Sequence, residues 1–183
     1  MRTARALSAL AVCLVLVAVL TFVGKPDGPG IAYADRGPDG WARSPSLEAR
    51  VTSVAVARLL IGRSGATMST AARFVVIGVE VRVHGYRQSV PARLHTVDGH
   101  VYAERTEGVV ARPPAVNAGF TGFGTVVFEV PGERVTGATL VLGPVREGFV
   151  QVFAGALRFP DVVANASTRR SVSMPAATTQ VTR

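Results

Sequence analysis

The stretch ARFVVIGVEVRVHG, residues 72–85, alternates along its length as a β-strand does. One parity carries five branched apolar side chains: Val75, Ile77, Val79, Val81 and Val83. Because successive side chains of a strand point to opposite faces of a sheet, this parity is expected to face a core. The other parity contains Glu80, which is expected to face water.

Similar runs follow one another over residues 47–160, and none shows an apolar stripe at helical spacing. Seven strands are predicted, near residues 49–60, 72–84, 91–97, 100–105, 125–130, 138–142 and 149–158. Short antiparallel strands that each have one apolar face predict two sheets packed as a sandwich. The fold class expected for residues 47–160 is therefore an all-β, antiparallel β-sandwich.

The dipeptide Asp98-Gly99 marks a hairpin whose loop length decides which side chains share a face. A two-residue turn would place His95 and Tyr102 on one side. A three-residue turn with a glycine bulge would instead gather Leu94 and Tyr102, which is the arrangement we favour.

Residues 6–24 are uncharged and predominantly apolar. As a helix, at 1.5 Å per residue, they would be about 28 Å long, close to the thickness of a bilayer core. Residues 1–24 are therefore expected to be an N-terminal membrane anchor or signal segment, with residues 6–24 as a transmembrane helix. Arg2 and Arg5 precede it and favour a cytoplasmic N-terminus with an exported body.

Two alternatives apply to this N-terminal segment. The triplet that ends at Ala34 has the small-residue pattern of a signal-peptide cleavage site, so secretion after cleavage stays open. The residues before Cys13 loosely resemble a lipoprotein cleavage site, but Val12 is too large for its last position. Cys13 is the only cysteine, so the exported part has no disulfide available.

Two segments outside residues 47–160 lack a core pattern. Residues 25–46 are rich in proline and glycine and are expected to be a spacer. Trp41, within it, either contacts the membrane interface or caps the domain, and we favour the cap. Residues 161–183 are expected to be a flexible tail, with one further edge strand considered near Ser171–Met174.

The formal net charge of +8 does not come from a basic cluster. The excess of arginine is spread along the chain, and Lys25 is the only lysine. A nucleic-acid reader would show clustered basic residues with interleaved aromatic residues. Nucleic acid is therefore not an expected partner.

The inventory of reactive side chains favours neither catalysis nor a metal site. No nucleophile motif is complete, and the only close carboxylate pair, Glu104 and Glu107, lies at the end of a predicted strand. His84, His95 and His100 lack the spacing of zinc ligands. The protein is expected to be no enzyme and to hold no cofactor or metal.

Residues 106–124 form the one connection longer than a sandwich needs. Phe120 and Phe123 either plug the open end of the sandwich or, together with Arg112, present a contact to a partner. Both interpretations stay open at this stage.

Three stretches together resemble a known family: RFVVIGVEVRV, LHTVDGHVY and GTVVFEVPGERVTGATLVL. The most specific piece is Phe128-Glu129-Val130-Pro131. Over residues 47–144 the chain resembles an uncharacterised family of bacterial exported immunoglobulin-like domains, whose superfamily includes the immunoprotective extracellular antigen of mycobacteria. The resemblance implies an immunoglobulin-like sandwich and attributes no catalytic residues. His84-Gly85 stands where many members have asparagine and glycine, and the immunoglobulin cysteine pair is absent.

Two functions are compatible with these patterns. The first is a membrane-anchored, extracytoplasmic, non-catalytic interaction module that serves another envelope protein or the cell wall. The alternative is a carrier or sensor of a small apolar ligand held between the sheets, which would need a cavity above about 300 Å³.

Overall fold

The computed structural model describes residues 32–84, 89–110, 115–143 and 155–181. Within them lie twelve strands and one short 3-10 helix: β1 Tyr33–Asp35, β2 Trp41–Arg43, β3 Leu47–Ile61, β4 Thr67–Val83, β5 Ala92–His95, β6 Val101–Ala103, β7 Phe120–Val130, η1 Gly132–Arg134, β8 Thr139–Leu142, β9 Ala156–Phe159, β10 Ser167–Thr168, β11 Ser171–Ser173 and β12 Thr178–Val181.

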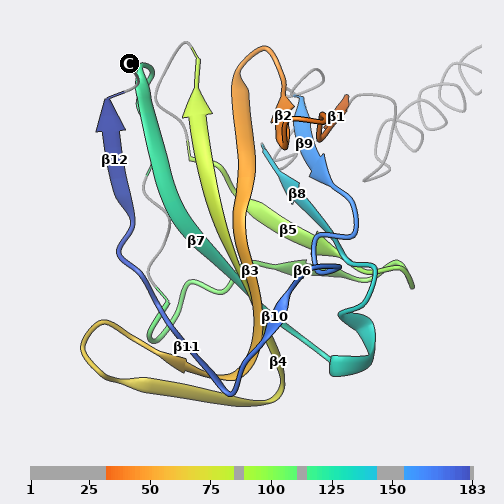
Figure 1. Cartoon of the computed structure of the whole chain (residues 1–183), viewed down its shortest axis with the longest axis vertical. Coiled ribbons are helices and arrows are strands. Elements are labelled where there is room, and N and C mark those ends of the chain that lie inside the picture. Colours follow the sequence, from red (N-terminus) through yellow and green to blue (C-terminus); the bar gives the residue numbers. More distant parts are fainter. Residues whose placement is uncertain (1–31, 85–88, 111–114, 144–154, 182–183) are drawn as a thin grey trace, which may run out of the picture. The chain divides into compact units, whose positions relative to one another are not determined.

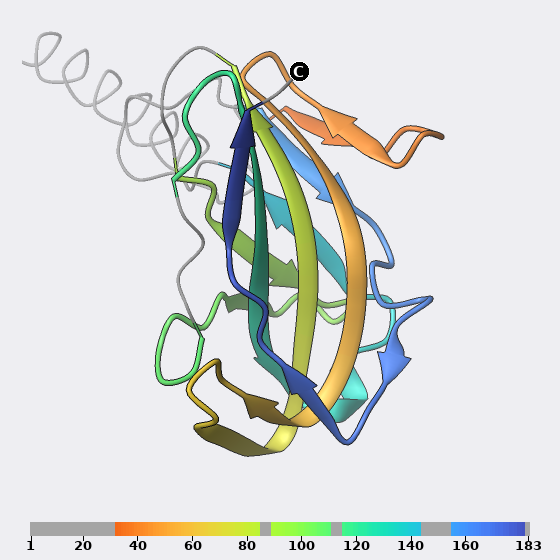
Figure 2. The same cartoon turned by 60° about the vertical axis from the view of Figure 1, so that its left-hand side comes forward.

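The strands form two sheets that pack face to face as a sandwich (Figures 1 and 2). The larger sheet has the order β10-β3-β4-β7-β12, and β2 and β11 also pair with β3. The smaller sheet has the order β1-β9-β8-β5-β6. The seven predicted strands are all present as β3 to β9, and their pairings are antiparallel. Residues 149–154 of the last predicted strand lie outside the described residues.

The core confirms the expected inward parity of β4. Its five branched apolar side chains all belong to the cluster between the sheets. Leu94, Phe128, Leu140 and Phe159 complete that cluster from strands of both sheets. Burial of these side chains is the main favourable contribution to the fold.

The other parity of β4 does not face water, which corrects the expectation. Phe74 and Val76 are buried on the outer face of the larger sheet, where they form a cluster with Val127 of the adjacent strand β7 and with Met174. Glu80 is only 3% exposed. The C-terminal segment supplies Met174, so residues distant in sequence create this second cluster.

Gly78 interrupts the apolar run of β4 for a steric reason. The register between β3 and β4 shifts between Val51 and Ser53. A Cβ atom at Gly78 would lie 2.5 Å from the Ser53 hydroxyl and 2.7 Å from that of Thr52. Only glycine leaves room for both hydroxyl groups at this irregularity.

Both terminal segments differ from the expectation. Part of the expected spacer is folded, because β1 pairs with β9 and β2 pairs with β3. The expected tail holds β10 and β11, which run parallel to β3, and β12, which pairs with β7. The edge strand considered near Ser171–Met174 is confirmed as β11. These strands form through main-chain hydrogen bonds and need little apolar patterning.

The transmembrane segment expected at residues 6–24 lies outside the described residues. Within the residues that are described, no helix has the length and apolar character needed to cross a bilayer.

Candidate interaction edge

The hairpin of β5 and β6 closes through a tight turn. Gly99 has φ +85°, its N–H donates to the Thr96 carbonyl at 3.0 Å, and the Thr96 N–H donates to the His100 carbonyl at 2.9 Å. This is a type I turn followed by a glycine bulge. Leu94 lies opposite Tyr102, so the three-residue turn favoured from the sequence is confirmed.

In this hairpin, β6 is an edge strand of the smaller sheet. Among the described residues, β6 pairs only with β5. In an antiparallel pair, the main-chain N–H and C=O groups of successive residues point alternately toward the partner strand and away from it. The carbonyl of His100 points toward β5, because it accepts a hydrogen bond from the Thr96 N–H. The N–H and C=O groups of Val101 and Ala103 therefore point away from β5. Val101 is 51% exposed and Val97, in the turn, is 80% exposed, so apolar side chains accompany these main-chain groups.

A carboxylate holds the hairpin in place. Asp98 accepts hydrogen bonds from the Thr96 hydroxyl and from Nδ1 of His100, at 3.2 Å, and pairs with Nε of Arg134 at 2.9 Å. Arg134 also donates to the Tyr102 hydroxyl at 3.1 Å, which ties η1 to β6. The hydrogen bond from the Thr96 hydroxyl is the largest cause that lowers the pKa of Asp98. Desolvation raises that pKa, and the charges of Arg134 and His100 lower it further.

The side chains expected at a partner contact are not brought together. Arg112 lies outside the described residues. Phe123 lies opposite Glu80 and Thr178, on the outer face of the larger sheet. Phe120 falls on the other parity of β7, at its first residue, and is exposed. Neither ring belongs to the core cluster, so the structure does not support a shared plug.

A cluster of charges around Trp41 was not anticipated. The Arg50 guanidinium contacts Oε2 of Glu80 at 2.6 Å, and that of Arg82 lies 3.5 Å from Oε1. The guanidinium carbons of Arg82, Arg50 and Arg43 lie 4.2, 5.0 and 6.0 Å from the centre of the Trp41 ring. Trp41 is 8% exposed, which agrees with its capping the domain. Only strand register brings these residues together, so sequence spacing could not reveal them.

The three histidines do not converge. His84 lies 3.3 Å from a Glu48 oxygen on the larger sheet, and His100 contacts Asp98. His95 lies opposite Val101. In the part of the chain that the structure describes, no three His, Cys, Asp or Glu side chains are placed to hold one metal ion.

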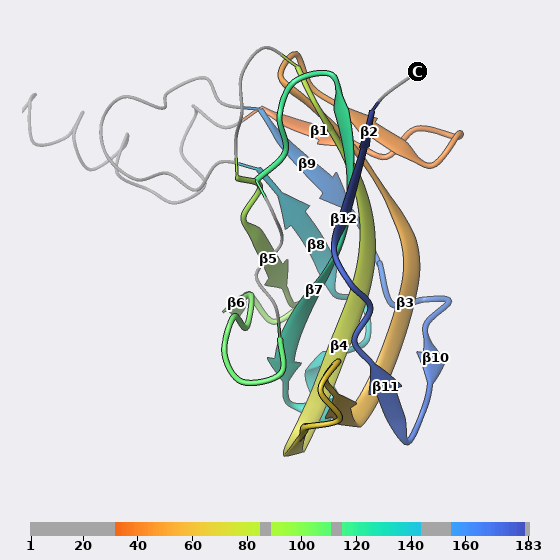
Figure 3. The same cartoon turned by 90° about the vertical axis from the view of Figure 1, so that its left-hand side faces the viewer.

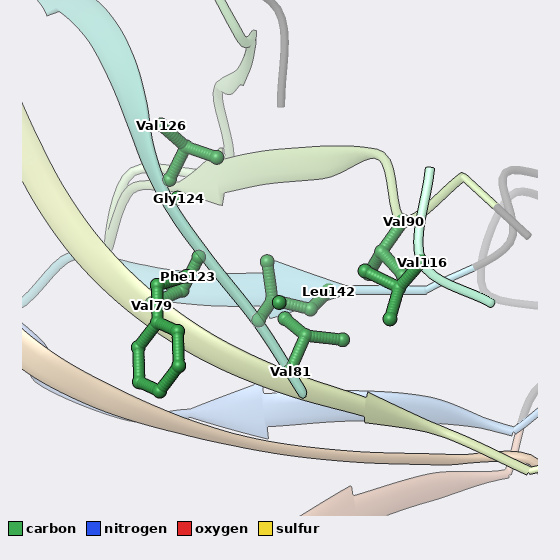
Figure 4. Close-up of a pocket in the computed structure, with 9 residues that line it drawn as sticks. Val79, Val81, Val90, Val116, Phe123, Gly124, Val126 and Leu142 are labelled. Atoms are coloured by element: carbon green, nitrogen blue, oxygen red, sulfur yellow. The ribbon is translucent and has the colours of Figure 1, made fainter. Parts of the chain in front are cut away.

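An apolar cavity is lined by side chains from both sheets (Figure 4). Val81, Val116 and Leu142 line it, and the ring of Phe123 points away from them. Its volume is about 20 Å³, which is room for about one water molecule. A carrier of small apolar ligands needs a site more than ten times larger, on the order of 300 Å³, so the cavity gives that alternative no support.

Comparisons with known proteins add little to this geometry. No family model and no curated protein matches the chain. An uncharacterised β-sandwich protein from Clostridium difficile aligns with 74% of this chain and 99% of its own, at 9% identity and a TM-score of 0.45. A protein described as a "putative lipoprotein" from Bacillus subtilis aligns with 67% of this chain and 38% of its own, at 14% identity and a TM-score of 0.43.

Proposed function

We propose that this protein is a membrane-anchored, extracytoplasmic, non-catalytic interaction module that binds another envelope protein by accepting an extended strand at β6. The observation that carries the proposal is the outward edge of β6. It presents main-chain groups beside the exposed side chains of Val97 and Val101. Strand addition uses this combination, because main-chain hydrogen bonds give affinity and alternate side chains give specificity.

The other outer strands differ from β6 in character. β10 consists of Ser167 and Thr168, and β12 has two threonines and a glutamine before the exposed Val181 at its end. β1 ends in Asp35, whose carboxylate pairs with Arg158 at 2.7 Å. Short polar or charged edge strands discourage pairing with other chains. Against that background, the exposed valines of the β5–β6 hairpin favour a docking role.

Rigidity also favours recognition at this edge. Asp98 joins the turn to Arg134, and Arg134 joins it to Tyr102, whose ring packs against the core. The hairpin is thus held in one conformation before a partner arrives. A preorganised strand loses less conformational freedom on binding than a mobile one.

The strand order supports the immunoglobulin-like arrangement that the resemblance implies. β3, β4 and β7 are neighbours in one sheet, and β9, β8 and β5 are neighbours in the other. Immunoglobulin sandwiches place their first, second and fifth strands together, and their third, sixth and seventh. Folds of this architecture commonly serve as recognition domains, which is an argument by analogy only.

The folded position of Ala34 supports a retained anchor over cleavage. Tyr33 and Ala34 pair with β9, and Ala34 packs against the core cluster. Cleavage after Ala34 would remove two of the three paired residues of β1. The proposed location is therefore the cell membrane, with residues 6–24 spanning it and the sandwich outside the cytoplasm.

The test is site-specific photocrosslinking of the full chain in its own membranes. A photoreactive residue at Val101 is expected to capture one protein reproducibly, and the same probe at Arg58, an exposed position on β3, is not. Val101→Lys should reduce co-purification of that protein about tenfold or more, because a charged lysine opposes strand addition.

The matched variant is Val101→Thr, which keeps the branched shape and should retain most of the binding. Capture of the same proteins from Val101 and Arg58 would refute docking at β6. Capture of no protein from Val97 or Val101 would count against an interaction role at this hairpin.

A further inference from the structure

The exposed large apolar side chains of the described residues form two separate pairs. Val97 and Val101 belong to the β5–β6 hairpin. Phe120 and Val181 lie directly opposite each other across the β7–β12 ladder. Phe120 is 36% exposed and Val181 is 68% exposed. The second pair is not part of the proposed docking edge and needs its own explanation.

Strand register shows which end of the sandwich bears this pair. One row of neighbours crosses the larger sheet: Arg43, Glu48, Arg82, Thr121 and Gln180. Phe120 and Val181 lie one step beyond that row. In Figure 3 the end of β12 and the strands β1 and β2 lie at the same end of the sandwich, and β6 lies away from it.

The described chain also enters the fold at this end, through Tyr33 in β1. Eight residues, 25–32, separate the proposed membrane segment from Tyr33. Fully extended, they can span at most about 28 Å. If residues 6–24 span the bilayer, Tyr33 therefore lies within about 28 Å of it, at the end that bears Phe120 and Val181.

We propose that Phe120 and Val181 contact the lipid surface and dock this end of the sandwich on the bilayer. The inference rests on the proposed membrane anchor. Large apolar side chains partition into the boundary between headgroups and acyl chains. Because the tether already holds the domain there, a high effective concentration lets a small contact suffice. Docking at this end leaves β6 directed away from the membrane, open to a partner.

The experiment uses tryptophan fluorescence of the full chain in vesicles of phosphatidylcholine and phosphatidylglycerol. Part of the phosphatidylcholine is brominated near the headgroup, which quenches only nearby indole rings. Trp41 is the only native tryptophan, and the parent chain measures its contribution, which is subtracted from that of each variant. The test variant is Phe120→Trp, and the matched control is Val97→Trp, an exposed position on the hairpin away from the bilayer.

Brominated lipid is expected to remove about half of the additional fluorescence of Phe120→Trp, because interfacial side chains enter only about 5–10 Å into the bilayer. The loss for Val97→Trp, taken beyond that of Trp41 in the parent chain, should be near zero. Val181→Trp provides a second probe of the same contact, since that side chain is exposed and its replacement leaves the core intact.

Two results would overturn the contact. If alkaline carbonate leaves the chain in the membrane but Phe120→Trp and Val181→Trp are quenched no more than Val97→Trp, the anchor stands and the lipid contact is wrong. If carbonate extracts the chain, the anchor and the contact that depends on it both fail, whereas the strand-addition test at Val101 is unaffected.

Discussion

Val79 and Glu80 are neighbours in β4, and both are buried, by different means. Val79 packs between the sheets. The Glu80 carboxylate lies on the outer face, where the guanidinium groups of Arg50 and Arg82 cover it. A buried carboxylate is tolerated only when charge and hydrogen bonds compensate for its lost hydration. Here the compensation comes from two arginines that are themselves partly exposed.

Replacement of Glu80 by glutamine should therefore destabilise the fold. The neutral amide loses the charge-assisted bond to Arg50, which we expect to lower the free energy of unfolding by about 1–2 kcal/mol. This loss of stability is smaller than the loss expected on breaking a fully buried ion pair, because both arginines reach solvent. Thermal unfolding of the full chain in detergent would measure the change.

The matched variant at the preceding position is Val79→Asp, which places an unpaired carboxylate in the core and should lower the free energy of unfolding by several kcal/mol. Val79→Asp is expected to lower the unfolding temperature more than Glu80→Gln does. If Glu80→Gln unfolds at the temperature of the parent, the contact with Arg50 is a surface ion pair of little consequence.

Asp98 makes the hairpin sensitive to acid. Its pKa lies below the ordinary value of an aspartate, chiefly because the Thr96 hydroxyl bonds to the carboxylate. A lowered pKa in the folded state means that the ionised group adds stability above the unfolded pKa. That stability disappears as the pH falls through the folded value. The hairpin should therefore loosen only in strongly acidic solution.

Asp98→Asn tests the direction of this pH dependence. The variant should unfold at a lower temperature than the parent at neutral pH, and the difference should vanish as the pH falls below the folded pKa of Asp98. Asp35 and Asp39 have lowered pKa values too, but they are common to both chains and cancel in the comparison. A difference that stays constant with pH would show that the charge of Asp98 is irrelevant.

At the scale of single elements, strands with an alternating apolar pattern were predictable, and the polar strands β10 and β12 were not. β4 has 17 residues, and five branched apolar side chains stand at every second position from Val75 to Val83. β10 has two residues and β12 has four, mostly serine and threonine, so neither carries an alternating apolar signal. Such strands are defined by their neighbours β3 and β7. A pattern within one segment cannot report a partner elsewhere in the chain.

The same limit explains what was missed at the candidate site. The Asp98-Gly99 turn was readable because a bulge there requires a positive φ, which glycine adopts without strain. That β6 would end its sheet, and so expose Val101, depends on which strand pairs with which. Phe120 and Phe123 suggested a contact by composition, but strand parity puts them on opposite faces.

At the scale of the whole folded unit, the first and last described segments serve as edge strands. β1 extends the smaller sheet beyond β9, and the C-terminal segment supplies β10 and β11 on one side of the larger sheet and β12 on the other. Because the C-terminal segment passes from β3 to β7, Met174 comes to cover the outer face of β4. The C-terminal segment thus both closes edges and completes a small core.

These two roles can be separated by truncation. A chain that ends at Ala176 loses only β12, whose residues are all exposed. The stability that the hydrogen bonds of β12 contribute is largely offset by the conformational entropy lost on ordering its four residues. The free energy of unfolding should therefore fall by less than about 1 kcal/mol. A chain that ends at Arg170 also loses β11 and Met174, and should fall by about 2–5 kcal/mol.

The shorter deletion should have a different consequence. Loss of β12 uncovers the main-chain groups of Phe120–Phe123, and an uncovered edge pairs with other chains. The chain that ends at Ala176 should therefore unfold near the parent temperature yet sediment as larger species as its concentration rises. Equal stability of the two truncated chains would show that Met174 does not secure the outer face. A monomeric chain without β12 would show that β12 is not needed to protect β7.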